Sequence, residues 1–186
     1  MSESEETFYT ADRWQNWLDR VAEEDLDPEN EDSARLLLNL QDDTAIAVAK
    51  ILAAYNDDRL TEEEATDEVA DIRDIVLGDV EIADEEKVML IDGVQTSLVC
   101  VFYAAEEYIV GGPAEEGSVA EYVEAAAAAE AEEDVDAALG CLVQAGTRII
   151  DGEELPMALA EDLEYGYVAE WVNGLDSLQS AMADPE

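Results

Sequence analysis

The segment that most constrains the fold of this chain is a long apolar stretch over residues 85–110, whose hydrophobic side chains occupy more than one helix face. These side chains are Val88, Ile91, Val94, Leu98, Val99, Val101, Phe102 and Ala105. A helix that is apolar over most of its circumference leaves water only when other elements surround it. We therefore predict that residues 85–110 form a central buried helix around which the rest of the chain packs.

The other segments show the three-and-four spacing of apolar residues that is typical of amphipathic helices. Capping residues bound these patterns: Thr10, Thr61 with Glu64, and Ser118 precede predicted helices, and Gly111 follows the central one. The predicted helices span residues 11–24, 33–56, 61–78, 85–110, 119–132, 135–150 and 156–182. The fifth and sixth of these helices are expected to form a helix hairpin.

No segment of strand length alternates apolar and polar residues, so the predicted fold class is all-α. We expect about seven helices in a compact bundle around the central helix. Residues 10–182 are predicted to form a single domain, between a disordered N-terminus at residues 1–9 and a tail at residues 183–186.

The charge of the chain is almost entirely of one sign, with 50 Asp and Glu, 8 Lys and Arg, and a net charge of −42 at pH 7. Like charges four residues apart on a helix each cost a few tenths of a kcal/mol. Their sum is comparable with a marginal stability of about 5–15 kcal/mol. Because the screening length falls from about 8 Å at 0.15 M salt to about 3 Å at 1 M, we expect a haloadapted protein of a K⁺-rich cytoplasm.

The absence of histidine removes several catalytic and metal-binding classes. Ser-His-Asp and Cys-His catalysis, HExxH zinc sites and Glu-x-x-His di-iron sites all require that residue. Neither GxxxxGK[ST] nor GxGxxG occurs, so no phosphate-binding loop is predicted. We therefore expect no cofactor and a role that is not enzymatic.

Partners and location are also restricted by the charge and by the N-terminus. Eight scattered cations do not form the basic face that nucleic acid or an anionic membrane requires. The start MSESEETFY lacks the basic and apolar regions of a signal peptide. The longest strictly apolar run, residues 98–105, is far shorter than the roughly 20 residues of a membrane span. We expect a cytoplasmic protein without nucleic-acid or membrane partners.

A site built from carboxylates alone stays open as an alternative. All-α nucleotide pyrophosphatases bind Mg²⁺ through acidic pairs three residues apart, and Glu121 with Glu124 has this spacing. If acidic residues were placed independently, a chain with 50 acids among 186 residues would contain about 13 acidic pairs three residues apart. Each such pair would share a helix face without any functional reason. The default interpretation of Glu121 and Glu124 is therefore an acidic surface, and metal binding is the alternative.

Two groups of residues are candidates for a partner surface. Trp14 and Trp17 lie in the first predicted helix, where core anchoring is the default and an aromatic binding patch is the alternative. Asp92 and Gln95 interrupt the central apolar helix, where packing or solvent contact is the default and a polar partner groove is the alternative.

Two segments resemble a known family: FYTADRWQNWLDRV, residues 8–21, and DGVQTSLVCVFYAAEEYI, residues 92–109. They resemble an archaeal, and specifically haloarchaeal, family known as domain of unknown function 2150, over most of residues 7–150. The resemblance implies an archaeal cytosolic protein without an assigned reaction, and it carries no functional residue over to this chain.

The functional prediction is a haloadapted, non-enzymatic helical protein that acts as an interaction or adaptor module. Its partner is expected to be another protein or a second copy of the chain. The alternative is a Mg²⁺-dependent all-α nucleotide pyrophosphohydrolase that uses only carboxylates.

Overall fold

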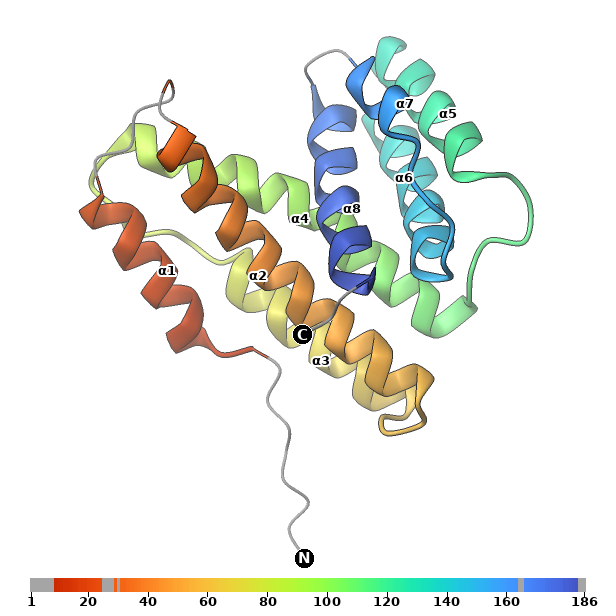
Figure 1. Ribbon diagram of the computed structural model, residues 1–186, viewed down its shortest axis with the longest axis horizontal. Coiled ribbons are helices and arrows are strands. Elements are labelled where there is room, and N and C mark those ends of the chain that lie inside the picture. The colour runs from red at the N-terminus through yellow and green to blue at the C-terminus, as the bar shows by residue number, and fades with distance from the viewer. Residues whose placement is uncertain (1–8, 25–28, 30, 164–165, 184–186) are drawn as a thin grey trace, which may run out of the picture.

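The computed structural model describes residues 9–24, 29, 31–163 and 166–183, and within these residues it contains helices and no strands. The all-α prediction is confirmed, with eight helices in the described residues (Figure 1). They are α1 (Ala11–Glu23), α2 (Glu31–Asn56), α3 (Glu62–Val76), α4 (Glu85–Gly111), α5 (Val119–Ala131), α6 (Val135–Ile150), α7 (Met157–Glu161) and α8 (Tyr167–Ala183).

Helix α4 is the central helix, as predicted, because α2, α3, α6 and α8 all pack against it (Figure 1). Leu98, Val101 and Phe102 of α4 are fully buried in this core. By length and composition alone, α4 would also be able to cross a membrane. A buried core helix has the same composition, and α4 packs against four neighbouring helices as such a core helix does.

Two glycines let α6 and α8 approach α4 closely. A Cβ atom at Gly174 of α8 would lie 2.0 Å from the carbonyl oxygen of Ser97 in α4. A Cβ atom at Gly146 of α6 would lie 2.4 Å from the Cβ atom of Ala104 in α4. Because any larger residue would overlap these atoms, glycine is required at both crossings. In each case the residue opposite the glycine is small.

The C-terminal helix predicted over residues 156–182 is in fact two helices, α7 and α8, so this part of the prediction was wrong. Glu130 of α5 lies at the N-terminus of α8, where its Oε2 accepts the N–H of Val168 at 3.1 Å. A Cβ atom at Gly166 would lie 2.9 Å from the same carboxylate. A carboxylate satisfies the free amide groups of a helix start, so this tertiary contact fixes where α8 begins.

Both chain ends extend outside the described residues. The predicted disordered N-terminus falls on residues 1–8, which lie outside them, and on Tyr9, whose side chain is buried with 6% exposed. The predicted tail starts at Ala183, the last residue of α8, and its other residues are not described.

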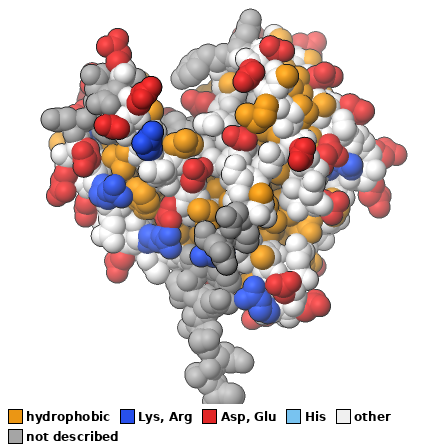
Figure 2. All heavy atoms as spheres, in the orientation of Figure 1, with side chains coloured by type: hydrophobic (Ala, Val, Ile, Leu, Met, Phe, Trp, Pro, Cys, Tyr) orange, Lys and Arg blue, Asp and Glu red, His pale blue; other side chains and the backbone are white. Residues whose placement is uncertain are grey.

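The described surface is dominated by carboxylates. Figure 2 shows Asp and Glu side chains scattered over the visible face, with fewer Lys and Arg side chains and with apolar side chains between them. Beneath this face lies an apolar core of buried side chains.

Substitution of Gly174 tests the close crossing of α8 and α4. Gly174→Ala should lower the free energy of unfolding by about 1–3 kcal/mol, because the added methyl group overlaps the Ser97 carbonyl oxygen. The matched control is Gly93→Ala in α4, where the nearest atom would be Glu170 Oε1 at 4.0 Å. That change should be neutral or stabilising by up to about 1 kcal/mol. Urea unfolding followed by circular dichroism measures both, and equal stabilities would contradict the close crossing.

Candidate functional site

A hollow of about 610 Å³ lies between α3, α4 and α6, and we call it the α4–α6 hollow. Its lining residues are Thr66 from α3, then Tyr103, Glu106, Glu107 and Val110 from α4, and Asp136, Leu139, Gly140, Val143 and Gln144 from α6. On both α4 and α6 these residues recur three or four positions apart, so each set shares one helix face. Two helix faces therefore meet at the hollow.

The hollow lies against a face of α4 near its C-terminal end that carries exposed side chains. Tyr103 is 42% exposed and Val110 is 63% exposed, whereas Phe102 and Ile109 beside them are buried. On α6, Leu139 and Val143 add half-buried apolar side chains. The hollow thus presents an apolar surface that the described part of the chain does not cover.

Acidic side chains accompany this apolar surface. Glu106 is half-buried and pairs with Arg73 of α3. Burial raises the pKa of Glu106, and the nearby positive charge of Arg73 opposes that rise. Glu107 and Asp136 are exposed and form no ion pair with any residue in the described part of the chain. Because no Lys or Arg is among the described residues that line it, the hollow favours positively charged groups.

Of the candidate partner residues, Trp14 is buried in the core and Trp17 connects α1 to α2. Trp14 is only 5% exposed, and the Nε1–H of the half-buried Trp17 donates to Asp43 Oδ2 at 2.9 Å. The same oxygen accepts the Nε–H of Arg13 at 2.8 Å. Both indole rings are thus engaged within the chain, and a partner role for them stays a prediction.

Tyr9 extends this contact between the N-terminal segment and α2. Its phenol oxygen lies 3.5 Å from Thr44 Oγ1 of α2. Burial raises the pKa of Tyr9 to about 12, so the phenol stays neutral at physiological pH. Tyr9 is therefore packed against α2.

The other two candidates, Asp92 and Gln95, lie on α4 before the hollow begins. The Gln95 side chain donates to the carbonyl oxygens of Val76 at 2.8 Å and Gly78 at 3.2 Å, which holds the end of α3 against α4. Asp92 is exposed and lies near Glu170 of α8. The pKa of Glu170 is raised, first by burial and second by the charge of Asp92. A partner role for Asp92 and Gln95 also stays a prediction.

The carboxylate pair Glu121 and Glu124 is exposed on α5. The backbone N–H of Glu121 donates to Ser118 Oγ at 3.2 Å, so Ser118 caps α5 as predicted. Within the described residues, no group of three or more Cys, Asp or Glu side chains is placed to hold a metal ion. Metal binding by Glu121 and Glu124 therefore has no geometric observation in its favour and stays a prediction.

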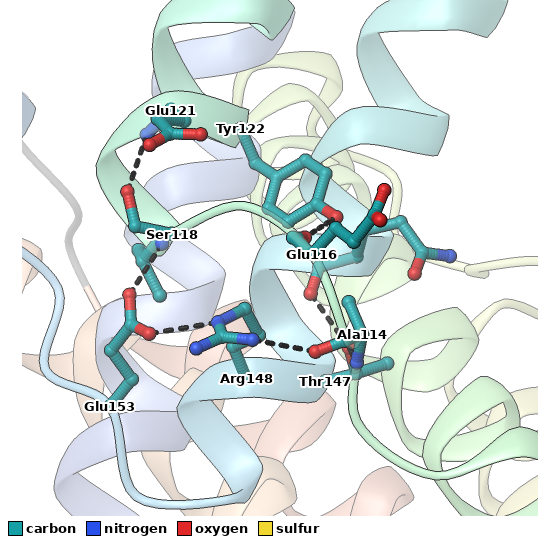
Figure 3. A network of polar contacts seen from close by, with 10 residues as sticks. Ala114, Glu116, Ser118, Glu121, Tyr122, Thr147, Arg148 and Glu153 are labelled. Atoms are coloured by element: carbon teal, nitrogen blue, oxygen red, sulfur yellow. Dashed lines mark hydrogen bonds and ion pairs between the residues drawn. The ribbon is translucent and has the colours of Figure 1, made fainter.

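A polar network holds the loop between α4 and α5 (Figure 3). Arg148 of α6 donates to the carbonyl oxygen of Ala114 at 2.6 Å and to Glu153 Oε1 at 2.8 Å. Glu153 also accepts the N–H of Val119, and this bond, with the Arg148 charge, lowers the pKa of Glu153. Thr147 Oγ1 accepts the N–H of Ala114 at 3.1 Å. Since these groups are directed at one another, we assign the network a structural role.

The α4–α6 hollow was not predicted from the sequence. The apolar residues of α4 were interpreted as a central buried helix, and Tyr103 and Val110 were not singled out. The sequence did contain a signal for the hollow, because Glu106 and Glu107 lie between Tyr103 and Val110 on one face of α4. An acidic and apolar face on a core helix indicates a side of that helix that no other segment covers.

The adjacent residues Asp42 and Asp43 of α2 provide a matched test of the electrostatics. Asp43 accepts from Arg13 and Trp17, so Asp43→Asn should lower the free energy of unfolding by about 1–3 kcal/mol and shift tryptophan emission to the red. The negative charges of Asp42 and Asp176 of α8 repel each other, so Asp42→Asn should raise the free energy of unfolding by about 0.5 kcal/mol. Effects of the same sign in urea unfolding would contradict these assignments.

The pH dependence of stability gives a further test. The pKa of Asp176 is raised, first by burial and second by the charge of Asp42. The folded state therefore binds a proton at Asp176 more tightly than the unfolded state does. Its contribution to stability is lost as the pH rises through the raised pKa and is regained as the pH falls. Asp176→Asn should remove this component from a pH series of urea unfolding, and an unchanged pH profile would contradict it.

Comparison with known proteins places the chain in a family. No curated protein and no solved structure matches it. A family model described as "Uncharacterized protein conserved in archaea (DUF2150)" matches residues 7–186. The match contains both segments on which the resemblance was based, and it extends beyond residue 150 to the end of the chain. The chain therefore belongs to the archaeal family DUF2150.

Proposed function

We propose that this protein is a non-enzymatic interaction module that binds a basic amphipathic helix of a partner protein in the α4–α6 hollow. The observation that carries the proposal is the pair of exposed apolar side chains, Tyr103 and Val110, which line the hollow on the central helix. The exposed carboxylates of Glu107 and Asp136 line the same hollow. Exposed apolar surface bordered by polar residues is typical of binding sites for proteins.

The shape of the lining supports a helix as the occupant. Apolar side chains on two helix faces form the type of surface into which a third amphipathic helix places residues three or four positions apart. Tyr103 and Val110 contribute from α4, and Leu139 and Val143 contribute from α6. A polar small molecule would find few directed donors here, because most of the lining is apolar or carboxylate.

The charge of the lining supports a basic partner. Glu107 and Asp136 lack ion-pair partners among the described residues, and the whole chain carries a net charge of −42. An acidic segment would be repelled, whereas Lys and Arg side chains at the edges of a helix would be attracted. The partner segment is therefore apolar along one stripe and basic beside it.

We also propose that this binding takes place in a salt-rich cytoplasm. At about 1 M salt the screening length is about 3 Å, so only charges in direct contact still attract each other strongly. Specificity then depends on contact pairs with Glu107 and Asp136, and affinity depends on apolar burial over Tyr103 and Val110. The hydrolase alternative has no comparable observation in the described residues, so protein binding is the function that we propose.

Selection from a displayed library of single helices, in molar KCl, tests this function. Helices selected on the wild-type protein should be rich in Lys and Arg beside an apolar stripe. Tyr103→Gln and Val110→Gln should each weaken their binding by about tenfold or more, since anchors in a hollow carry most of the affinity. Fluorescence anisotropy measures the affinities.

The matched control is Met89→Gln, because Met89 lies on the same helix, is 73% exposed and does not line the hollow. This variant should bind the selected helices as the wild type does. Failure to select any helix, or equal binding by the Val110→Gln and Met89→Gln variants, would contradict the proposed function.

A further inference from the structure

Gly140 lies within α6 and lines the α4–α6 hollow. A Cβ atom built on Gly140 would meet no atom within 4 Å in the described chain. Glycine is a poor residue for the interior of a helix. No contact in the described part of the chain therefore explains why this position lacks a side chain.

The other glycines of this fold show what a glycine does when two helices cross. Gly146, on the same helix, allows contact with Ala104 of α4, and Gly174 of α8 allows contact with the backbone of Ser97 in α4. In both crossings a glycine faces a small residue, which lets two main chains come close together. Gly140 also lacks a side chain, but it lies on a face of α6 against which no helix of the described chain is packed.

We infer that Gly140 is the position at which the main chain of the partner helix comes closest to this protein. The partner presents a small residue there, Gly, Ala or Ser, as Ala104 and Ser97 do at the internal crossings. This inference rests on the proposed function, and it names one feature of the partner that the function alone does not require.

The neighbours of Gly140 define the rest of the partner helix. Leu139 and Val143 lie beside Gly140 on α6, so apolar residues of the partner flank its small residue. Asp136 lies one turn before Gly140, and Glu107 lies on α4 at the same hollow. The Lys or Arg side chains of the partner are therefore placed within reach of these two carboxylates, on either side of the apolar stripe.

The variant Gly140→Ala tests the inference with two readouts of opposite sign. In the free protein it should raise the thermal midpoint by about 2–4 °C, because alanine favours the helix and the methyl group meets no atom. Binding of helices selected on the wild type should fall by about tenfold or more, because the methyl group occupies the space of the partner main chain. Gly93→Ala, outside the hollow, should leave that binding unchanged.

The selected helices supply the second arm of the experiment. They should share one position restricted to Gly, Ala or Ser, and replacement of that residue by Leu should weaken binding to the wild type by about tenfold or more. If Gly140→Ala binds as the wild type does while Val110→Gln does not, the inference is overturned and the proposed function stands. If no position of the selected helices is restricted to Gly, Ala or Ser, the inference is likewise overturned. Unchanged binding by both variants would overturn the proposed function as well.

Discussion

The fold depends on the burial of one apolar helix, α4, within a chain of net charge −42. Apolar burial contributes roughly 25 cal/mol per Å² whatever the charge of the surface, whereas the surface carboxylates repel one another. Four of the eight cations lie where different elements meet. These contacts are Arg13 with Asp43, Arg73 with Glu106, Arg148 with Glu153 and with the Ala114 carbonyl, and Lys87 with the carbonyl of Ala22. Cations at such contacts attach α1, α3 and the α4–α5 loop to the core.

The parts of the fold that follow from local sequence were predictable. Thr10, Thr61, Asp84 and Ser118 each cap a helix, because a side-chain oxygen before an apolar pattern can satisfy free amide groups wherever the helix packs. The division of α7 from α8 was not predictable, because it depends on Glu130, which lies in another helix and about forty residues earlier. Capping is local, whereas a carboxylate brought in by tertiary packing leaves no local pattern.

The candidate site illustrates the same limit. Helical spacing indicates which residues of α4 and α6 share a face, but it does not show which face the other helices leave uncovered. Gly140 and Gly146 are six residues apart on one helix, and nothing in the sequence separates their roles. Only the contacts do: Gly146 would collide with Ala104 if it were larger, and Gly140 would touch nothing. The site is therefore a product of packing, built from residues whose types are ordinary for a helix.

We propose that burial of α4 holds this fold together only while salt screens the surface carboxylates. The free energy of unfolding in urea, measured from millimolar to molar KCl, tests it most directly. A parallel series with sucrose, which is excluded from protein surfaces but carries no charge, separates screening from a general solvent effect. We expect the free energy of unfolding to rise steeply with KCl and much less with sucrose. Equal stability in millimolar and molar KCl would contradict it.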